Sequence, residues 1–288
     1  MKQIVVISGK GGTGKTSIVA ALAGLGPKKV LADCDVDAAD LHLILHPNII
    51  ETQPFVSGEQ PSIDPALCDQ CGLCRDQCRF QAISDDLKIL LEHCEGCAVC
   101  SYVCPNSAIT MLPRTCGEQY RSDTRFGSMI HAALGTGEEN SGKLVTSVRR
   151  AAKDLAEAQN ADMVLVDGSP GVGCPVIASL TDTDLAVLVA EPTISAVHDL
   201  KRVHALTKHF QLPSAMIINK SGINDQQEEA LRDYCTLERI PVLGAFPYDA
   251  TFTQAQIAGQ SILEYDPDGL GEQARAVWGA LATLLKLH

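Results

Sequence analysis

The sequence predicts an α/β protein whose doubly wound, mostly parallel sheet carries a small inserted domain. Three observations support this prediction. The apolar run Ile4-Val5-Val6-Ile7 leads through a glycine-rich turn into Ile18-Val19-Ala20-Ala21-Leu22, which is the order strand, turn, helix. Later apolar runs alternate with helical segments, as repeated βα units require. From Ile63 to Ser107, cysteine spacing replaces hydrophobic periodicity as the main pattern.

Composition narrows the class of partner. With 288 residues, 45% of them apolar and 20% charged, the chain resembles an ordinary globular protein and is long enough for one large domain with an insert. Its net charge of −12 counts against sequence-independent binding of DNA or of anionic membranes, which need a basic surface. We therefore expect no nucleic-acid partner and no membrane partner.

The twelve cysteines are best interpreted through the expected compartment. The N-terminus reads as a strand rather than a secretory leader, and no apolar run is long enough to span a membrane, so we expect a cytoplasmic protein. Clustered cysteines in that compartment are more often metal ligands than disulfides.

The first turn carries the strongest single motif. Residues 9 to 16 match the phosphate-binding pattern G-x-x-x-x-G-K-T between a strand and a helix. In this pattern Lys15 reaches the β- and γ-phosphates and the Thr16 hydroxyl binds Mg²⁺. A glycine turn that binds nothing is the alternative. The expected nucleotide-binding residues are Gly9, Lys10, Gly11, Gly12, Thr13, Gly14, Lys15, Thr16 and Ser17.

Lys10 adds a second lysine that a minimal phosphate loop does not need. The run K-G-G-T-G-K-T resembles the deviant Walker A motif of the family that contains the ATPases MinD and ParA and the nitrogenase iron protein. The resemblance implies an ATP-dependent homodimer, or a heterodimer with a paralogue, in which Lys10 reaches the partner's ATP and takes part in catalysis. The alternative is a solvated loop charge.

Carboxylates follow the second strand, Val30-Leu31-Ala32. An Asp at the carboxyl end of a parallel strand beside a phosphate loop can hold the hydration shell of Mg²⁺ and orient the attacking water. The segment resembles the family's switch I, and we assign the catalytic and Mg²⁺-binding role to Asp35, with Asp33 and Asp37 as weaker candidates. Asp40 we interpret as a helix cap.

The third buried strand, Met163-Val164-Leu165-Val166, ends in Asp167, the Walker B arrangement for binding Mg²⁺ through water. The following D-x-x-P-G-x-G run resembles the family's switch II. By the same resemblance, Asn219 reads the adenine edge, and Pro247 belongs to a loop that closes over the base. Cys174 we interpret as a buried, inert thiol. The alternative is a ligand of a cluster that bridges the dimer, because one such ligand of the nitrogenase iron protein has the same spacing from the switch II Asp.

The cysteines form two repeats, C-x₂-C-x₂-C-x₃-C, typical of bacterial two-cluster ferredoxins. In such repeats the fourth cysteine ligates the other cluster. One [4Fe–4S] cluster is therefore assigned to Cys68, Cys71, Cys74 and Cys104, and the other to Cys78, Cys94, Cys97 and Cys100. Arg79 stands where the pattern usually has Pro. A zinc ribbon or disulfides are the alternatives.

These motifs divide the chain. Residues 1–60 and 113–288 are expected to form the P-loop ATPase domain, and residues 61–112 the inserted ferredoxin-like domain. Residues 113–143, rich in Gly, Ser and charge, are expected to be exposed loops. The helical pattern from Glu272 to Leu285 is expected to pack on the sheet rather than to bind a membrane, because it has few basic residues.

As a whole, the chain resembles the MinD-superfamily ATPases with an inserted ferredoxin domain. The resemblance implies ATP, Mg²⁺ and two [4Fe–4S] clusters as cofactors. We expect an ATP-hydrolysing dimer that couples nucleotide state to electron transfer with an unknown redox or acceptor protein. The alternatives are an assembly or carrier ATPase for metalloproteins, and a MinD-like positioning ATPase whose clusters are structural or sense redox state.

Overall fold

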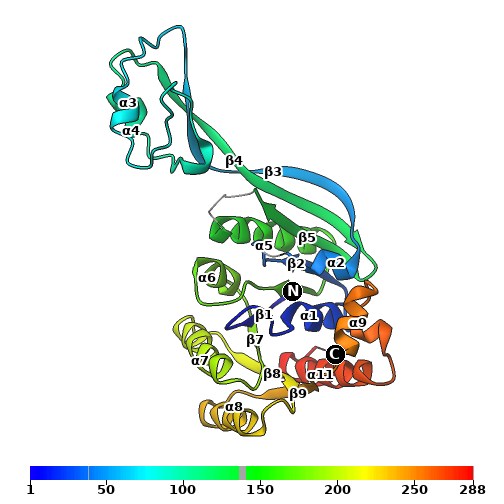
Figure 1. Ribbon diagram of the computed structural model, residues 1–288. Coiled ribbons are helices and arrows are strands. Elements are labelled where there is room, and N and C mark those ends of the chain that lie inside the picture. Colours follow the sequence, from blue (N-terminus) through cyan, green and yellow to red (C-terminus); the bar gives the residue numbers. More distant parts are fainter. Residues whose placement is uncertain (38, 136–140, 288) are drawn as a thin grey trace. The chain divides into compact units, whose positions relative to one another are not determined.

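The structure is a computed structural model that describes residues 1–37, 39–135 and 141–287 (Figure 1). The chain divides into two compact units. The larger unit comprises Met1–Gln53, Gln119–Ala133 and Ser141–His288, and the cysteine-rich unit comprises Pro54–Glu118 and Leu134–Asn140.

Strands and helices alternate along much of the chain. The strands are β1 (Lys2–Ser8), β2 (Lys29–Asp33), β3 (Asn48–Ile63), β4 (Ile109–Thr124), β5 (Gly127–Leu134), β6 (Met163–Asp167), β7 (Leu185–Ala190), β8 (Ser214–Ser221) and β9 (Val242–Pro247). The helices are α1 (Lys15–Ala23), α2 (Leu41–Leu45), α3 (Leu73–Asp76), the 3₁₀ turn η1 (Leu91–His93), α4 (Val99–Val103), α5 (Ser141–Ala158), α6 (Cys174–Leu180), α7 (Ile194–His209), α8 (Asp225–Glu238), α9 (Thr251–Ile257), α10 (Ile262–Tyr265) and α11 (Leu270–Leu285).

The strands form one sheet in the order β3-β4-β5-β2-β6-β1-β7-β8-β9. From β5 to β9 in this order, neighbouring strands pair in parallel. The predicted α/β class with a mostly parallel sheet is therefore confirmed. Because β1 lies at the centre between β6 and β7, the loops after β1, β2 and β6 leave the same edge of the sheet close together.

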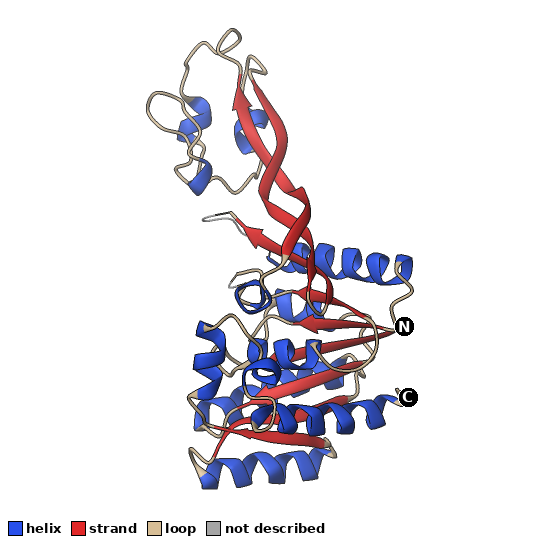
Figure 2. Ribbon diagram, turned by 90° about the vertical axis from the view of Figure 1, so that its right-hand side faces the viewer, coloured by secondary structure: helices blue, strands red, loops and turns tan. Residues whose placement is uncertain are grey.

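Helices cover both faces of the sheet (Figure 2). Helices α1, α10 and α11 pack together on one face, and the pairs α5 with α6 and α7 with α8 pack with the strands on the other. Strand residues such as Val5, Leu165 and Val187 are fully buried, as expected of parallel strands covered on both faces.

Helix α11 packs against β9 and α1. Its buried residues Leu270, Ala274, Val277 and Leu281 recur at helical spacing, so its apolar stripe faces the sheet as expected. None of the helices described here is long and apolar enough to cross a membrane.

The cysteine-rich unit has its own small apolar centre. Cys74, Ile83 and Ile109 are buried there, and Ile63, Leu87 and Ile89 pack against them. The expectation of loops over residues 113–143 is wrong for the residues described: β4 continues to Thr124, β5 follows, and α5 begins at Ser141. Most of β4 is exposed or half-buried, so backbone pairing stabilises it without an apolar pattern in the sequence. In β5, by contrast, residues 128–132 are buried, and sequence reasoning overlooked this run.

Candidate functional site

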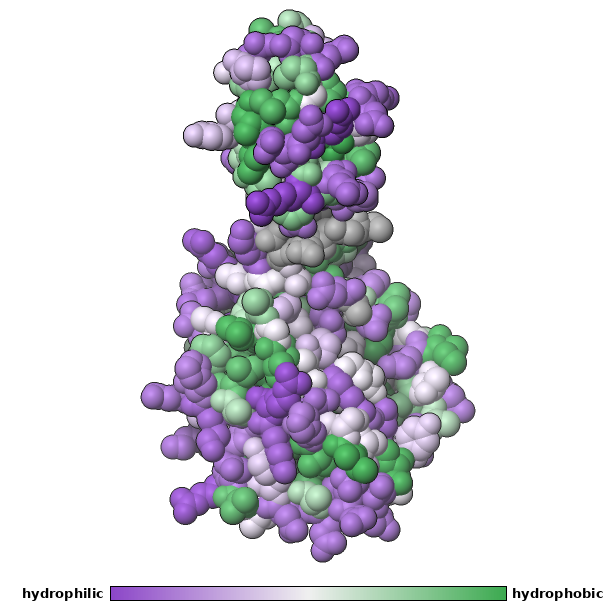
Figure 3. Space-filling view, turned by 60° about the vertical axis from the view of Figure 1, so that its left-hand side comes forward, coloured by the Kyte–Doolittle hydropathy of each residue, from purple (hydrophilic) through white to green (hydrophobic). Residues whose placement is uncertain are grey.

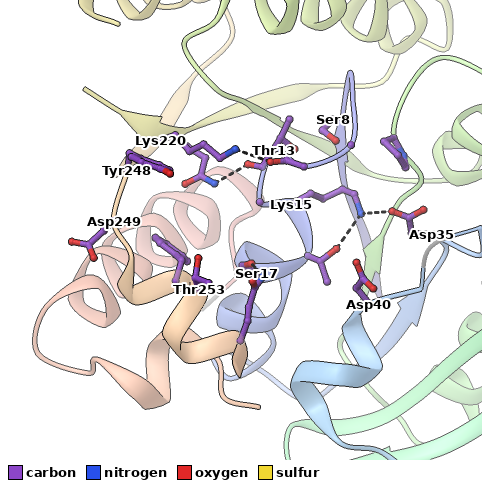
Figure 4. Close-up of a pocket in the computed structure, with 18 of the residues that line it drawn as sticks. Ser8, Thr13, Lys15, Ser17, Asp35, Asp40, Lys220, Tyr248, Asp249 and Thr253 are labelled. Atoms are coloured by element: carbon purple, nitrogen blue, oxygen red, sulfur yellow. Dashed lines mark hydrogen bonds and ion pairs between the residues drawn. The ribbon is translucent and has the colours of Figure 1, made fainter. Parts of the chain in front are cut away.

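The main cavity of the larger unit lies at the carboxyl edge of the sheet and has a volume of about 490 Å³. This is within the usual range of ligand sites. The described lining comes from the glycine turn, the ends of four strands and helix α9 (Figure 4). These residues are Ser8, Gly11, Gly12, Thr13, Gly14, Lys15, Thr16, Ser17, Asp35, Asp40, Pro170, Asn219, Lys220, Pro247, Tyr248, Asp249, Phe252, Thr253 and Gln256.

The glycine turn is shaped by backbone that only glycine adopts readily. Gly14 has a φ of 83°, and a Cβ there would lie 2.1 Å from Nδ2 of Asn219. The close approach lets Asn219 donate from Nδ2 to the Thr13 carbonyl at 2.7 Å. Helix α1 begins at the next residue, so its N-terminus faces the cavity, as anion binding requires.

Lys15 forms the centre of a buried ion-pair network. Its Nζ lies 2.5 Å from Oδ1 of Asp167 and 3.4 Å from Oδ2 of Asp35. Burial alone would lower the pKa of Lys15, but the charges of Asp167 and Asp35 raise it above its usual value. Burial, followed by the charge of Asp167, raises the pKa of the Asp33 carboxyl well above its usual value, and burial also raises the pKa of Asp35.

Two carboxylate oxygens in this network are buried without a hydrogen-bond partner among the described residues: Oδ2 of Asp33 and Oδ2 of Asp167. Buried polar atoms are rarely left unpaired unless they serve a ligand or ion. Carboxylate and hydroxyl oxygens are the ligands that Mg²⁺ prefers, and Asp35, Asp167 and Thr16 supply them beside the phosphate loop. The donor set thus fits Mg²⁺ with its water shell.

The other end of the cavity is formed by β8, β9 and α9. Asn219 is 4% exposed, and its Oδ1 has no hydrogen-bond partner among the described residues, so one acceptor remains for a ligand. Pro247 and Tyr248 line the same end. Gln256 donates from Nε2 to the Ser17 hydroxyl at 2.6 Å, joining α9 to the phosphate-loop helix.

Three predicted residues differ from expectation. Cys174, expected to be buried, is exposed at the first residue of α6. Asp40 occupies the N-cap position of α2, but its side chain makes no capping hydrogen bond and instead lines the cavity. Lys10 contacts its own chain: its Nζ lies 2.6 Å from Oε1 of Glu191. Its expected contact with a partner's nucleotide stays a prediction.

The cysteine-rich unit has two smaller cavities, each lined by four cysteines. The lining of the first includes Cys68, Cys71, Cys74 and Cys104, and that of the second includes Cys78, Cys94, Cys97 and Cys100. The fourth cysteine of each repeat thus lines the cavity that the other repeat's first three cysteines form.

The fourth cysteines are also matched in their hydrogen bonds. The backbone N–H of Ala82 donates to Sγ of Cys78 at 3.4 Å, and that of Ala108 to Sγ of Cys104 at 3.3 Å. Within the described ranges, no group of three or more His, Cys, Asp or Glu side chains is placed to hold a metal ion. The ligation of clusters therefore stays a prediction.

A family model for the CobQ/CobB/MinD/ParA nucleotide-binding domain matches residues 4–262. The chain belongs to this family. An uncharacterized protein of Methanocaldococcus jannaschii, MJ0578, is 37% identical over 226 residues, which cover 77% of this chain and 79% of that protein. A putative septum site-determining protein MinD of Mesostigma viride is 25% identical over 272 residues, covering 91% and 76% of the two chains.

Solved structures agree with this assignment. The septum site-determining protein MinD of Pyrococcus horikoshii, complexed with Mg-ADP, superposes with a TM-score of 0.61 at 20% identity, covering 99% of this chain and 97% of that one. The chain is therefore a MinD/ParA-like ATPase by family and fold.

Sequence reasoning missed Gln256, which lines the cavity, and Glu191, which pairs with Lys10 and Lys220 beside it. Gln256 lies on a helix with no motif, and only its position after Pro247 could have suggested it. Glu191 directly follows β7, at the same sheet edge as Asp35 and Asp167, so the rule that singled out those carboxylates applies equally to it.

Proposed function

We propose that this chain binds MgATP in the main cavity, hydrolyses it, and forms a dimer when ATP is bound. The observation that carries the proposal is the joining, in one cavity, of a phosphate loop, the Asp35 carboxylate and an unpaired Asn219 oxygen at the opposite end, with Asp167 paired to Lys15 of the same loop. The complex of the Pyrococcus horikoshii MinD with Mg-ADP supports the same assignment.

In this proposal the roles follow from position. Lys15 and the N-terminus of α1 bind the phosphates, and Thr16, Asp35 and Asp167 hold Mg²⁺ and its water. Asp35 is the only one of these carboxylates that is both partly exposed and on the cavity wall, so it is the residue that can orient an attacking water.

The test is Mg²⁺-dependent phosphate release from ATP. Asp35→Asn is expected to lower turnover by about a hundredfold, within the usual range for a general base. Asp37→Asn is the matched control, because Asp37 is exposed and is not among the residues lining the cavity. Equal losses in both variants, or none in either, would exclude the role of Asp35.

We further propose that the cysteine-rich unit holds two [4Fe–4S] clusters, one in each cysteine-lined cavity. A cluster places each cysteine on a different iron, which accounts for four-cysteine cavities in which no single-ion site is found among the described residues. The paired N–H···S hydrogen bonds are of the kind that tunes cluster potentials.

Anaerobic purification followed by iron analysis tests this proposal. We expect about eight iron atoms per chain. Cys174→Ser should keep the same iron content, since Cys174 is exposed and lines neither cysteine cavity. Zinc in place of iron, or iron that survives removal of all eight cysteines, would contradict it.

The comparisons favour a MinD-like positioning role over electron transfer, because the named relatives and structures are septum site-determining proteins. One observation favours electron transfer as a second candidate: Cys74, Cys78, Cys100 and Cys104, two from each cavity, pack on a single apolar cluster. Bound clusters would supply one-electron redox chemistry at close range.

Two measurements separate these candidates. A positioning ATPase sediments with a membrane or polymer only when ATP is present, and its cluster potentials are the same with ATP and ADP. A nucleotide-gated electron carrier shows a potential that differs between the two states and no such recruitment.

A further inference from the structure

Glu191 holds two lysines at once. Its carboxylate lies just after β7, and its side chain is only 9% exposed. Oε1 lies 2.6 Å from Nζ of Lys10, and Oε2 lies 2.6 Å from Nζ of Lys220. Each oxygen thus binds one lysine, and the two lysines keep the pKa of Glu191 below its usual value although burial acts to raise it.

Lys10 is directed onto its own chain by more than this ion pair. Its Nζ donates to the hydroxyls of Ser195 at 3.1 Å and Thr193 at 3.4 Å. Thr193, like Glu191, lies in the connection between β7 and α7, and Ser195 lies in the first turn of α7. Lys10, which resembles the family's lysine that reaches the partner's ATP, therefore binds residues of its own chain.

Lys220 links the same carboxylate to the phosphate loop. Its Nζ donates to the Gly12 carbonyl at 2.8 Å, so the side chain reaches from the end of β8 to the glycine turn (Figure 4). Its φ of 55° lies in the left-handed region, which costs a residue with a Cβ about 1 kcal/mol or more. Such strained backbone is often found at functional sites.

We propose that Glu191 is a positioning residue that holds Lys10 on its own chain until the triphosphate of a second copy competes for it. This inference rests on the proposed ATP-dependent dimer. A triphosphate carries several negative charges against one on Glu191, so ATP bound to the second copy outcompetes Glu191, whereas an empty second copy offers Lys10 no competing anion. Glu191 thereby opposes dimer formation by the nucleotide-free protein.

Chemical labelling of Lys10 tests the holding role without requiring a dimer. In the nucleotide-free protein, Glu191→Gln is expected to speed acylation of Lys10, measured by peptide mass spectrometry, by about fivefold. That factor corresponds to an ion pair of about 1 kcal/mol. Glu191→Asp keeps the buried charge but has a shorter reach, so it should give a smaller increase and covers the case in which Glu191→Gln does not fold.

The matched control is Glu238→Gln. Glu238 pairs with Lys208 at 2.9 Å and does not line the main cavity. This variant should speed the labelling of Lys208 and leave Lys10 unchanged. Equal labelling of Lys10 in wild type, Glu191→Gln and Glu191→Asp would overturn the holding role.

Sedimentation with ATP, with ADP and without nucleotide then separates the two levels of the proposal. We expect Glu191→Gln to dimerise with ATP at least fivefold more tightly than wild type, because Lys10 is already free. If wild type binds no ATP, the proposed function fails whatever the labelling shows. If wild type binds ATP and dimerises, and Glu191→Gln dimerises with equal affinity, the role of Glu191 fails while the proposed function stands.

Discussion

Replacing Lys15 with Met should destabilise the nucleotide-free protein as well as abolish its ATPase activity. The ammonium group lies 2.5 Å from Asp167 and 3.4 Å from Asp35, and the side chains of Lys15 and Asp167 are 5% and 1% exposed. Methionine fills a similar volume but leaves the carboxylates without a countercharge. Removing one partner of a buried ion pair typically costs about 3 to 5 kcal/mol of unfolding free energy, and we expect a loss in that range at pH 7.5.

Urea unfolding in EDTA at a series of pH values measures the loss. Because the pKa of Asp33 and of Asp35 is raised in the folded protein, the folded state binds more protons than the unfolded state between the usual value and the raised one. Stability therefore increases as pH falls through that window. The increase should be steeper in Lys15→Met than in wild type, so the difference in unfolding free energy between the two proteins should be smaller at pH 5 than at pH 7.5. Lys15→Arg keeps the charge and should lose less. A deficit below about 1 kcal/mol at pH 7.5, or one that grows on acidification, would refute the buried network as described.

Three further predictions concern the glycine contacts, the cysteine cavities and Lys29. Gly26→Ala should cost more stability than Gly222→Ala in thermal unfolding. Both glycines have a left-handed φ, of 79° and 86°. A Cβ on Gly26 would lie 1.9 Å from the Trp278 ring, whereas a Cβ on Gly222 would have none of the described atoms within 4 Å. Cys104→Ser and Cys78→Ser should each halve the iron content and leave one intact cluster signal in electron paramagnetic resonance; loss of both signals in either variant would argue against two separate cavities. Burial lowers the pKa of Lys29 to about 8. Between pH 8 and 10.5 the unfolded state therefore binds one proton more than the folded state, so the free energy of unfolding should increase as pH rises. Lys29→Met should remove this pH dependence in urea titrations, and an unchanged pH dependence would show that another group causes it.

The buried strands were the most predictable part of the fold. Val5, Val30, Leu165 and Val187 lie in continuous apolar runs, and such runs are needed only where both faces of a strand are covered. Strand β3 shows the opposite case: nearly all of its residues from Asn48 to Gln60 are exposed or half-buried, so no apolar pattern marks it. Its stability comes from backbone pairing with β4, which sequence patterns do not report.

Some residues of the candidate site were likewise predictable from the sequence, and others were not. Lys15 and Thr16 were predictable because the phosphate loop fixes their spacing, and the structure places them on the cavity wall. The sheet-edge rule applies to Glu191 too, but no accompanying motif marks this residue, and its two lysine partners are located only by the structure. Asp40 was interpreted as a cap from local sequence, whereas its side chain lines the cavity, since local rules do not include the neighbouring loops.

The cysteine-rich unit exposes apolar residues on its surface. On the face drawn in Figure 3, apolar residues gather on this unit among polar ones. Leu73, Phe80 and Val99 line the cysteine cavities and are each about 40% exposed, the most exposed being Phe80 at 44%. Apolar side chains beside the cysteines would exclude water from bound clusters on one side while leaving the rim accessible, and solvent exposure is one of the variables that sets a cluster potential.

Within the larger unit, Arg125 connects helix α2 to the turn between β4 and β5. Its guanidinium donates to the carbonyls of Ile44 and Leu45 at the end of α2, at 3.0 and 2.8 Å, and pairs with Glu264. Helix α2 leads directly into β3, and Arg125 directly follows β4, the two strands through which the chain enters and leaves most of the cysteine-rich unit. A shift of α2 would therefore either break these hydrogen bonds or carry the turn with it. Since breaking charge-assisted hydrogen bonds costs about 1.5 to 3 kcal/mol each, the second outcome is the cheaper one, and it moves both strands together.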